Sequence, residues 1–286
     1  KFDRPFESVQ VYNGKDAVSG NEFEGEHALA AVKFATRRGD KVNVAVASSF
    51  ISLEQAYTNL REVEGKDLEA VKADAKARWN DILGRIEVSG GSTDQYRTFY
   101  SCLYRSTLFP RKFYEIDKNG KILHYSPYNG KVCEGYMYTD TGFWDTFRAL
   151  FPLLNLVYPS INKEIQLGLV NIAKENPFLP EWASPGHRGC MVGNNSASVV
   201  ADAIMKGVST EDLDTLYRAI VYGTEHVHPQ VNSSGRLGHE YYNTLGYIPY
   251  DVGINENVAR TLEYAYNDWC ILQIAKKLNR PEAEIK

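Results

Sequence analysis

The chain has few cysteines and methionines, no excess of positive charge and no long hydrophobic run. Its 286 residues include four cysteines and three methionines. The cysteines lie far apart, with no CxxC or Cys/His spacing to suggest a metal site, and their apolar surroundings predict buried free thiols. They are Cys102, Cys133, Cys190 and Cys270. No run of about 18 apolar residues could span a membrane, and a net charge of -4 argues against a nucleic-acid partner.

Several common catalytic motifs are also absent. The sequence contains no GxSxG elbow, no P-loop and no GxGxxG after a strand, so the mechanisms tied to those motifs find no support. No fixed-period repeat is visible, which disfavours a solenoid. The loop histidines His226, His228 and His239 lack the spacing of a metal site, and we expect them to face solvent.

Aromatic residues, in contrast, are abundant. The chain has 19 tyrosines, 12 phenylalanines and 4 tryptophans. Tyrosine and tryptophan combine a flat apolar face with a polar tip, which suits stacking on sugar rings. Composition alone equally allows a tyrosine-rich core and surface.

The character of the sequence changes twice. Residues 1–52 alternate like strands in the runs VQVY, HALAAVKFA and KVNVAVASSFI, with a turn signal at Asn13-Gly14. Residues 53–108 have a helical period, and Ser52 and Ser92 occupy N-cap positions. We therefore expect the last strands of a sheet domain followed by a helical linker.

Residues 109–286 begin with a hairpin signal at Asn119-Gly120 and continue as helices joined by long loops. The expected helices are 142–158, 160–175, 193–207, 210–223 and 257–279. The loops 176–192 and 224–256 are rich in Gly, Pro, His, Asn and aromatics, and loops of that length are usually functional. The pattern predicts a helical toroid with a pocket at its mouth.

The segment GFWDTFRALFPLL, residues 142–154, places charged side chains in an apolar run. As one continuous helix it would bury a stripe that includes Phe143 and Leu154 and place Trp144, Asp145 and Arg148 on another face. Asp145 could stabilise the helix dipole and pair with Arg148. Alternatively, Trp144 could form a platform beside a carboxylate that accepts hydrogen bonds from sugar hydroxyls. Both interpretations stay open.

Two further segments carry candidate ligand-binding residues. Trp182 lies in a loop and Asn194 at the beginning of a helix, which are favourable positions for contact with a ligand. Glu263 and Asp268 lie among aromatic residues of the last long helix. Partial desolvation there could suit a general acid, or the two carboxylates could simply accept hydrogen bonds from neighbouring groups.

Together these segments resemble the family 92 glycoside hydrolases, exo-acting α-mannosidases common in gut Bacteroides. The matching runs follow one another in order: VAVASSFISLEQAYTNL, RWNDILGRIEV, FYSCLYRSTLFP, GFWDTFRALFPLL, LPEWASPGHRGCMVGNNSASVVADAIMKG and GYIPYDVGINENVARTLEYAYNDW. A single run would be weak support, but their joint order and spacing make the resemblance specific.

The resemblance implies a multidomain α and β fold. Residues 1–52 would end an N-terminal β-sandwich, residues 53–108 would form a helical linker, and residues 109–286 would form the first part of an incomplete (α/α)6 barrel. The abrupt start and end of the sequence likewise lead us to expect a piece of a larger protein, whose remaining polypeptide would be a partner of this segment.

The resemblance also implies calcium-assisted, inverting hydrolysis of terminal α-linked mannose, α-1,2 in the first instance, in mannose-rich glycans, by a secreted, periplasmic or cell-surface enzyme. The catalytic acid, the base and the calcium ligands would lie beyond Lys286, so none is assigned here. Trp144 and Asp145 match the family pattern of the mannose pocket. Five residues lie in matching motifs as further substrate-binding candidates: Arg148, Trp182, Asn194, Glu263 and Asp268.

The sequence departs from the family pattern at Arg105, where histidine is more usual, and at Asn267, where aspartate is more usual. Two other functions therefore stay open. One is a related (α/α)6 glycosidase or phosphorylase that acts on α-glucosides. The other is a carbohydrate-binding segment without catalysis of its own.

Overall fold

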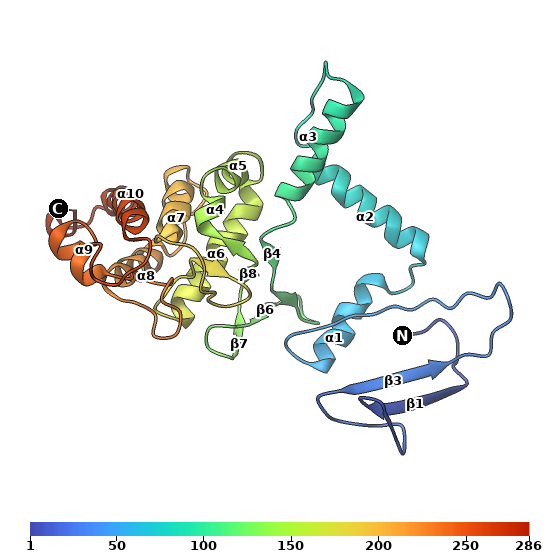
Figure 1. The fold of residues 1–286 in the computed structure, drawn as a ribbon. Helices are drawn as coiled ribbons and strands as arrows, with labels where there is room; N and C mark the ends of the chain where they lie inside the picture. The colour runs from blue at the N-terminus through green and yellow to red at the C-terminus, as the bar shows by residue number, and fades with distance from the viewer. Residues whose placement is uncertain (286) are drawn as a thin grey trace.

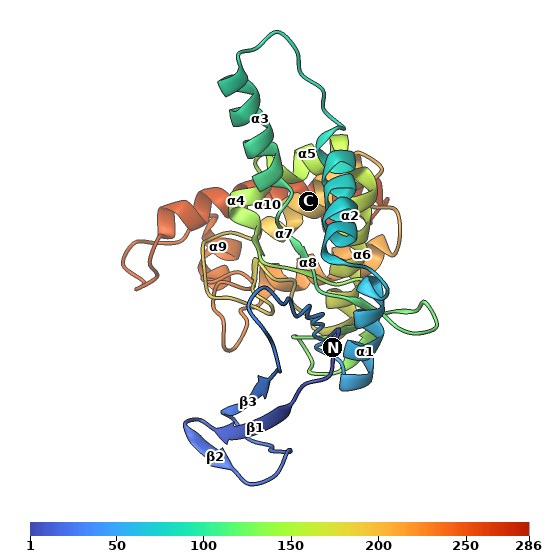
Figure 2. The ribbon, with the colours of Figure 1, turned by 90° about the vertical axis from the view of Figure 1, so that its right-hand side faces the viewer.

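The computed structural model describes residues 1–285, which form three parts in chain order (Figure 1). A small sheet lies at the N-terminal end, three helices follow, and a larger helical part occupies the other end. Both views place the small sheet away from the larger helical part (Figure 1, Figure 2).

The N-terminal sheet has three antiparallel strands in the order β2-β1-β3. They are β1 (Ser8–Asn13), β2 (Asp16–Val18) and β3 (Ala28–Lys33). The turn predicted at Asn13-Gly14 joins β1 to β2, and Gly14 has the positive φ of 59° that such a turn requires.

The strand expected in KVNVAVASSFI does not form. That segment is extended, but its ladder is limited to one isolated bridge between Val44 and Phe2. Alternating side chains favour an extended backbone, whereas a strand also needs a neighbour to accept its hydrogen bonds. Val46 is 83% exposed, so this alternation has no buried face in the described chain.

The next helices begin where the capping residues predict. They are α1 (Leu53–Leu60), the 3-10 turn η1 (Arg61–Val63), α2 (Leu68–Leu83) and α3 (Thr93–Ser106). Ser52 accepts a hydrogen bond from the Gln55 backbone, and Ser92 and Gln95 form a complete capping box. The Tyr158 hydroxyl donates to the Ile82 carbonyl at 3.0 Å, which ties the end of α2 to the larger helical part.

Short antiparallel strands introduce that larger part. They are β4 (Arg111–Lys112), β5 (Glu115–Ile116), β6 (Ile122–Tyr125), β7 (Val132–Glu134), β8 (Tyr138–Thr139), β9 (Thr141–Gly142) and β10 (Trp182–Ala183). The hairpin predicted at Asn119-Gly120 joins β5 to β6. In the sheet β5-β6-β7, His124 lies directly opposite Cys133.

The helices of the larger part are α4 (Phe143–Thr146), α5 (Leu150–Val157), α6 (Pro159–Glu175), α7 (Asn195–Met205), α8 (Leu213–Glu225), α9 (His239–Leu245), α10 (Asn257–Lys277) and α11 (Glu282–Ile285). The expected loop 224–256 thus contains a short helix.

The prediction of a single helix over 142–158 is wrong, because the chain leaves helical geometry at Ala149, with φ −143°. Pro152 supplies the reason: it has no N–H to donate to Arg148, and its ring excludes a continuous helix there, so α5 starts with Pro152 in its first turn.

The core lies among α5, α6, α7, α8 and α10. Phe151, Val199, Leu216 and Ile274 are completely buried there.

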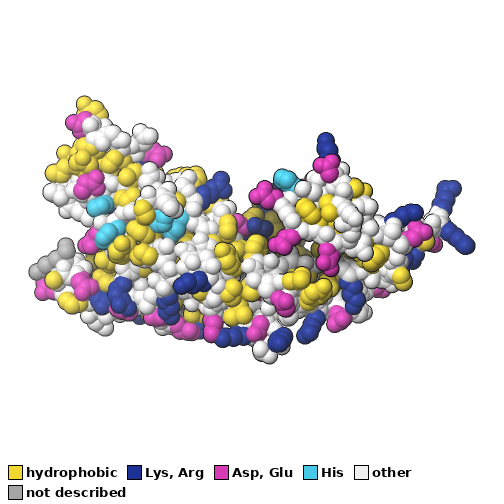
Figure 3. All heavy atoms as spheres, turned by 90° about the horizontal axis from the view of Figure 1, so that it is seen from below, with side chains coloured by type: hydrophobic (Ala, Val, Ile, Leu, Met, Phe, Trp, Pro, Cys, Tyr) yellow, Lys and Arg dark blue, Asp and Glu magenta, His cyan; other side chains and the backbone are white. Residues whose placement is uncertain are grey.

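No helix within residues 1–285 is both long and apolar enough to cross a membrane. On the face seen in Figure 3, acidic and basic side chains are interspersed. The domain boundaries, the sandwich and the barrel remain predictions.

The cysteines are less buried than their apolar context predicts. Cys270 is buried, Cys133 and Cys190 are half-buried, and Cys102 is exposed; all four are free thiols. Cys102 lies on α3, a helix whose only buried residue is Leu103. An apolar neighbourhood in sequence therefore does not ensure burial where a helix packs on one narrow stripe.

Two leucines of α5 provide a matched test of the core. Leu154 is 4% exposed and Leu156 is 80% exposed. Leu154→Ala is expected to lower the free energy of unfolding by about 2–5 kcal/mol, because it leaves a cavity in the core. Leu156→Ala should change it by less than about 0.5 kcal/mol. Urea denaturation followed by circular dichroism measures both; equal losses would contradict the assigned orientation of α5.

Candidate functional site

Trp144 and Arg148 both contact Glu263, which joins α4 to α10. The Trp144 indole Nε1 donates to Glu263 Oε1 at 3.1 Å, and the Arg148 Nη2 donates to the same oxygen at 3.1 Å. The Arg148 guanidinium also lies 4.7 Å from the centre of the Trp144 ring, and its Nε donates to the Trp144 carbonyl. These contacts hold the indole in one orientation and cover part of one face.

The second oxygen of Glu263 has no hydrogen-bond partner in the described structure. Oε2 is buried, and the Glu263 side chain as a whole is 17% exposed. A buried carboxylate oxygen without a donor is costly. Glu263 therefore offers an unmet acceptor beside Trp144.

Asp145 is exposed and makes no hydrogen bond or ion pair with any of residues 1–285. The predicted pairing of Asp145 with Arg148 is therefore wrong. α4 ends at Thr146, so Arg148 lies outside it and turns back over Trp144 toward Glu263. The Asp145 carboxylate keeps all its acceptor capacity for groups that reach it from solution.

A second cluster surrounds Arg236, which the sequence analysis did not identify. Its buried guanidinium donates from Nε to Asn194 Oδ1 at 3.1 Å and from Nη2 to Asp268 Oδ1 at 2.5 Å. It also lies 5.1 Å from the ring of Tyr242 and 4.9 Å from that of Tyr264. The predicted residues Asn194 and Asp268 are therefore brought together because both bind Arg236. The loop that carries Arg236 has no sequence pattern that would have indicated this.

Asn267 connects the two clusters. Its Oδ1 accepts from the Asn194 backbone N–H at 2.7 Å, and its Nδ2 donates to Asn195 Oδ1 and Ser198 Oγ at 3.1 and 3.2 Å. Asn267 is completely buried, and Glu263 lies one turn earlier on α10. An amide fits here because it can accept and donate at once, whereas an ionised aspartate has no donor for Asn195.

Trp182 supports the segment that leads into α4. β10 pairs with β9, so Trp182 lies opposite Gly142. A Cβ atom at Gly142 would lie 1.9 Å from the Trp182 Nε1, so only glycine allows this contact. Arg188 lies 5.0 Å from the centre of the Trp182 ring. The structure thus brings Trp182 against the backbone before Trp144, and within the described residues the two indoles share no hydrogen bond or ring contact.

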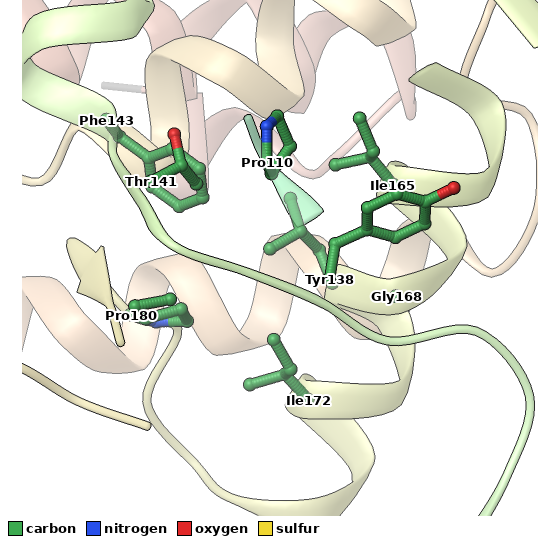
Figure 4. A pocket seen from close by; sticks show the side chains of 10 residues that line it. Pro110, Tyr138, Thr141, Phe143, Ile165, Gly168, Ile172 and Pro180 are labelled. Atoms are coloured by element: carbon green, nitrogen blue, oxygen red, sulfur yellow. The ribbon is translucent and has the colours of Figure 1, made fainter. Parts of the chain in front are cut away.

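Neither Trp144 nor Asp145 lines either of two small cavities in the described chain. One is lined mainly by hydrocarbon, including Tyr138, Phe143 and Ile165 (Figure 4). The Tyr138 hydroxyl donates to Glu164, which leaves few groups that could recognise a polar ligand there. The other cavity is lined by Glu181 and Asn194 among others. The second cavity thus includes Asn194, one of the predicted substrate-binding residues, and the expected pocket at the mouth of the helices remains a prediction.

Glu181 is a buried carboxyl group that the sequence pattern did not single out. It accepts from the backbone N–H and the hydroxyl of Ser196, both at 2.8 Å, at the beginning of α7. Burial raises the pKa of Glu181 to about 8, although the hydrogen bonds from Ser196 oppose this shift. The carboxyl group therefore takes up a proton far more readily in the folded chain than in the unfolded one.

The raised pKa of Glu181 predicts a pH-dependent stability. The proton bound in the folded state stabilises the fold at low pH, and this contribution is lost as pH rises from about 4.5 through about 8. The wild-type free energy of unfolding should fall relative to that of Glu181→Gln across this window, with a slope approaching about 1.4 kcal/mol per pH unit. Urea titrations at several pH values measure the difference, and exposed Glu225→Gln is the control. Parallel pH profiles for wild type and Glu181→Gln would contradict the prediction.

Comparison with known proteins gives consistent results. The model of the glycosyl hydrolase family 92 catalytic domain matches residues 55–286. A protein named as an uncharacterized secreted glycosidase from Arthroderma benhamiae is 30% identical over 254 residues, which is 84% of this chain and 28% of that relative.

Solved structures of the same family are also similar. A family GH92 inverting mannosidase from Bacteroides thetaiotaomicron superposes with a TM-score of 0.90 at 45% identity, over 99% of this chain and 39% of the other. A second family GH92 α-mannosidase from that organism, in complex with mannoimidazole, gives a TM-score of 0.81 at 26% identity, over 99% of this chain and 37% of the other. This chain thus spans less than two fifths of the length of these relatives. With a family match that covers most of its length, the chain belongs to glycosyl hydrolase family 92.

Proposed function

We propose that this chain forms part of the mannose-binding side of a glycoside hydrolase that removes terminal α-linked mannose from mannose-rich glycans with inversion. Family membership supports this, as does the likeness to an inverting mannosidase. The observation that carries the proposal is the exposed, unpaired Asp145 carboxylate beside the fixed indole of Trp144.

The geometry suits the recognition of a single sugar ring. The apolar C–H face of mannose can pack on an indole, while its hydroxyls need hydrogen-bond acceptors. Arg148 lies over one face of Trp144, so the sugar would use the remaining surface of the ring. Asp145 would accept hydrogen bonds from hydroxyls, because an ionised carboxylate is a strong acceptor, and Glu263 would hold the indole in place from beneath the surface.

The chemical step needs two further carboxyl groups. Inverting glycosidases use one as acid and one as base, roughly 6.5–9.5 Å apart across the sugar ring. Glu263 and Asp268 are each held as acceptors by an arginine. As the family resemblance implies, we propose that both catalytic groups belong to polypeptide outside this chain, and that this chain binds and orients the mannose.

Calcium is not assigned to any residue of this chain. Calcium takes six to eight oxygen ligands. Among residues 1–285, the one group of three or more His, Cys, Asp or Glu side chains close enough to share an ion is His124, Cys133 and Glu175. That group offers nitrogen and sulfur and does not fit calcium. As the family resemblance implies, we propose that the calcium ligands belong to polypeptide outside this chain.

The finer substrate and location follow the family resemblance. We propose α-1,2-linked mannose as the preferred substrate and a secreted, periplasmic or cell-surface location; the fungal relative is itself named as secreted. Linkage-defined mannobioses distinguish the α-1,2 preference from others. Release of glucose from α-glucosides instead would favour the alternative (α/α)6 glycosidase or phosphorylase.

Asp145 provides the test of the proposed function. In the full-length protein that carries this chain, Asp145→Ala should lower kcat/KM for mannose release by about 10- to 150-fold, as expected for loss of about 1.5–3 kcal/mol from hydrogen bonds to a charged group. Asp251→Ala, also exposed and in the same part of the chain, is the control and should leave kcat/KM unchanged. Mannose release is measured by anion-exchange chromatography, and the anomer first formed by proton NMR.

Equal activity of Asp145→Ala and the wild type would remove Asp145 from the site. Absence of mannose release by the wild type, or release of the retained anomer first, would overturn the proposed function itself.

A further inference from the structure

Three side chains with different donor atoms converge beneath the β6–β7 hairpin. His124 of β6 and Cys133 of β7 are cross-strand partners, and Glu175 is the last residue of α6. The possible ligand atoms of these three residues lie within 4.8 Å of one another. His124 is completely buried, the Glu175 side chain is 8% exposed, and Cys133 is half-buried.

The hydrogen bonding of His124 is incomplete without a cation. Its Nδ1 lies 2.8 Å from the Gly135 carbonyl oxygen, and its Nε2 lies 2.8 Å from Glu175 Oε1. A neutral imidazole carries only one N–H, so it can donate to only one of these two acceptors. With the proton on Nδ1, the lone pair of Nε2 faces the carboxylate. At 2.8 Å a proton lies between the two atoms, and a bound metal ion would replace that proton and move the two atoms to about 3.3 Å apart.

The surrounding groups have further unmet acceptors and donors. Glu175 Oε2 and the Tyr128 hydroxyl are both buried without a hydrogen-bond partner in the described structure. The Asn129 side-chain amide lies 3.8 Å from Cys133 Sγ and donates to it. The site therefore gathers electron-rich atoms at the C-terminal end of α6, where the helix dipole also favours a cation.

We propose that His124, Cys133 and Glu175 bind a divalent transition-metal ion, and that Zn²⁺ fits them best. One imidazole nitrogen, one thiolate and one carboxylate oxygen are a typical set of zinc ligands, whereas calcium and magnesium prefer oxygen alone. The Gly135 carbonyl would hold the proton on Nδ1 and leave Nε2 to the metal, which is the usual orienting contact of a metal-binding histidine. A fourth position is left for water or for the Tyr128 hydroxyl.

The ion would fasten the hairpin to α6. His124 and Glu175 are 51 residues apart in sequence, so one shared ligand sphere closes a long segment of chain. Binding forms bonds from the metal to nitrogen, sulfur and oxygen and releases the thiol proton to solvent, with no change in oxidation state. This site is independent of the proposed mannose site, since it shares no residue with it.

Metal content and spectroscopy test the proposal. The full chain, stripped with a chelator and dialysed against Zn²⁺, should retain one equivalent of zinc by mass spectrometry. Replacing Zn²⁺ by Co²⁺ should produce a thiolate-to-cobalt charge-transfer band in the near ultraviolet. Cys133→Ser should lose the band and weaken Zn²⁺ binding by at least about 10-fold, while Cys190→Ser, equally half-buried, should keep both.

Other outcomes would overturn the site. Retention of less than a tenth of an equivalent of zinc by the wild type would show that a proton, and not a metal, joins His124 to Glu175. Undiminished zinc and cobalt binding by Cys133→Ser would show that the ion is bound elsewhere. If circular dichroism shows that Cys133→Ser is unfolded, Glu175→Gln replaces it, since the amide preserves the shape and removes the charged ligand.

Discussion

The amide of Asn267 is the contact on which the candidate site depends. From the interior of α10 it holds the beginning of α7 through Asn194, Asn195 and Ser198. Both clusters of the site then follow from one helix: Glu263 meets Trp144 and Arg148 one turn before it, and Asp268 meets Arg236 directly after it. These buried hydrogen bonds matter mainly because they fix the orientation of α7 relative to α10. Each neutral hydrogen bond adds only about 1 kcal/mol to the free energy of unfolding.

Local signals were sufficient for several elements of the fold. The caps at Ser52 and Ser92 and the turn at Asn13-Gly14 need no distant partner, since side chain and backbone of the same short segment supply all the hydrogen bonds. Prediction failed where the outcome depended on other segments. The run KVNVAVASSFI has the alternation of a strand but lacks a neighbour. The break in the helix over 142–158 is different, because Pro152 within the segment is a local signal against a continuous helix.

The same distinction separates the predicted site residues from those that were missed. Trp144, Glu263 and Asp268 were recognisable because polar or aromatic side chains interrupt apolar helices. Arg236 was not, because its partners lie 32 and 42 residues away and its own loop has no periodicity. Likewise, no spacing in the sequence relates His124 to Glu175, although the hairpin brings His124 opposite Cys133. Chemistry that spans three elements becomes visible only when strand register and helix packing are known.

The contact between Trp182 and Gly142 has an optical consequence. Two of the four tryptophans lie at the junction of β9 and α4: Trp144 in the first turn of α4, hydrogen-bonded to a carboxylate, and Trp182 packed against Gly142 at the end of β9. Indole emission is sensitive to such polar and packing surroundings. A sugar that settles on this segment would therefore change the intrinsic fluorescence of the chain, which gives the native sequence a built-in reporter of occupancy without any attached dye.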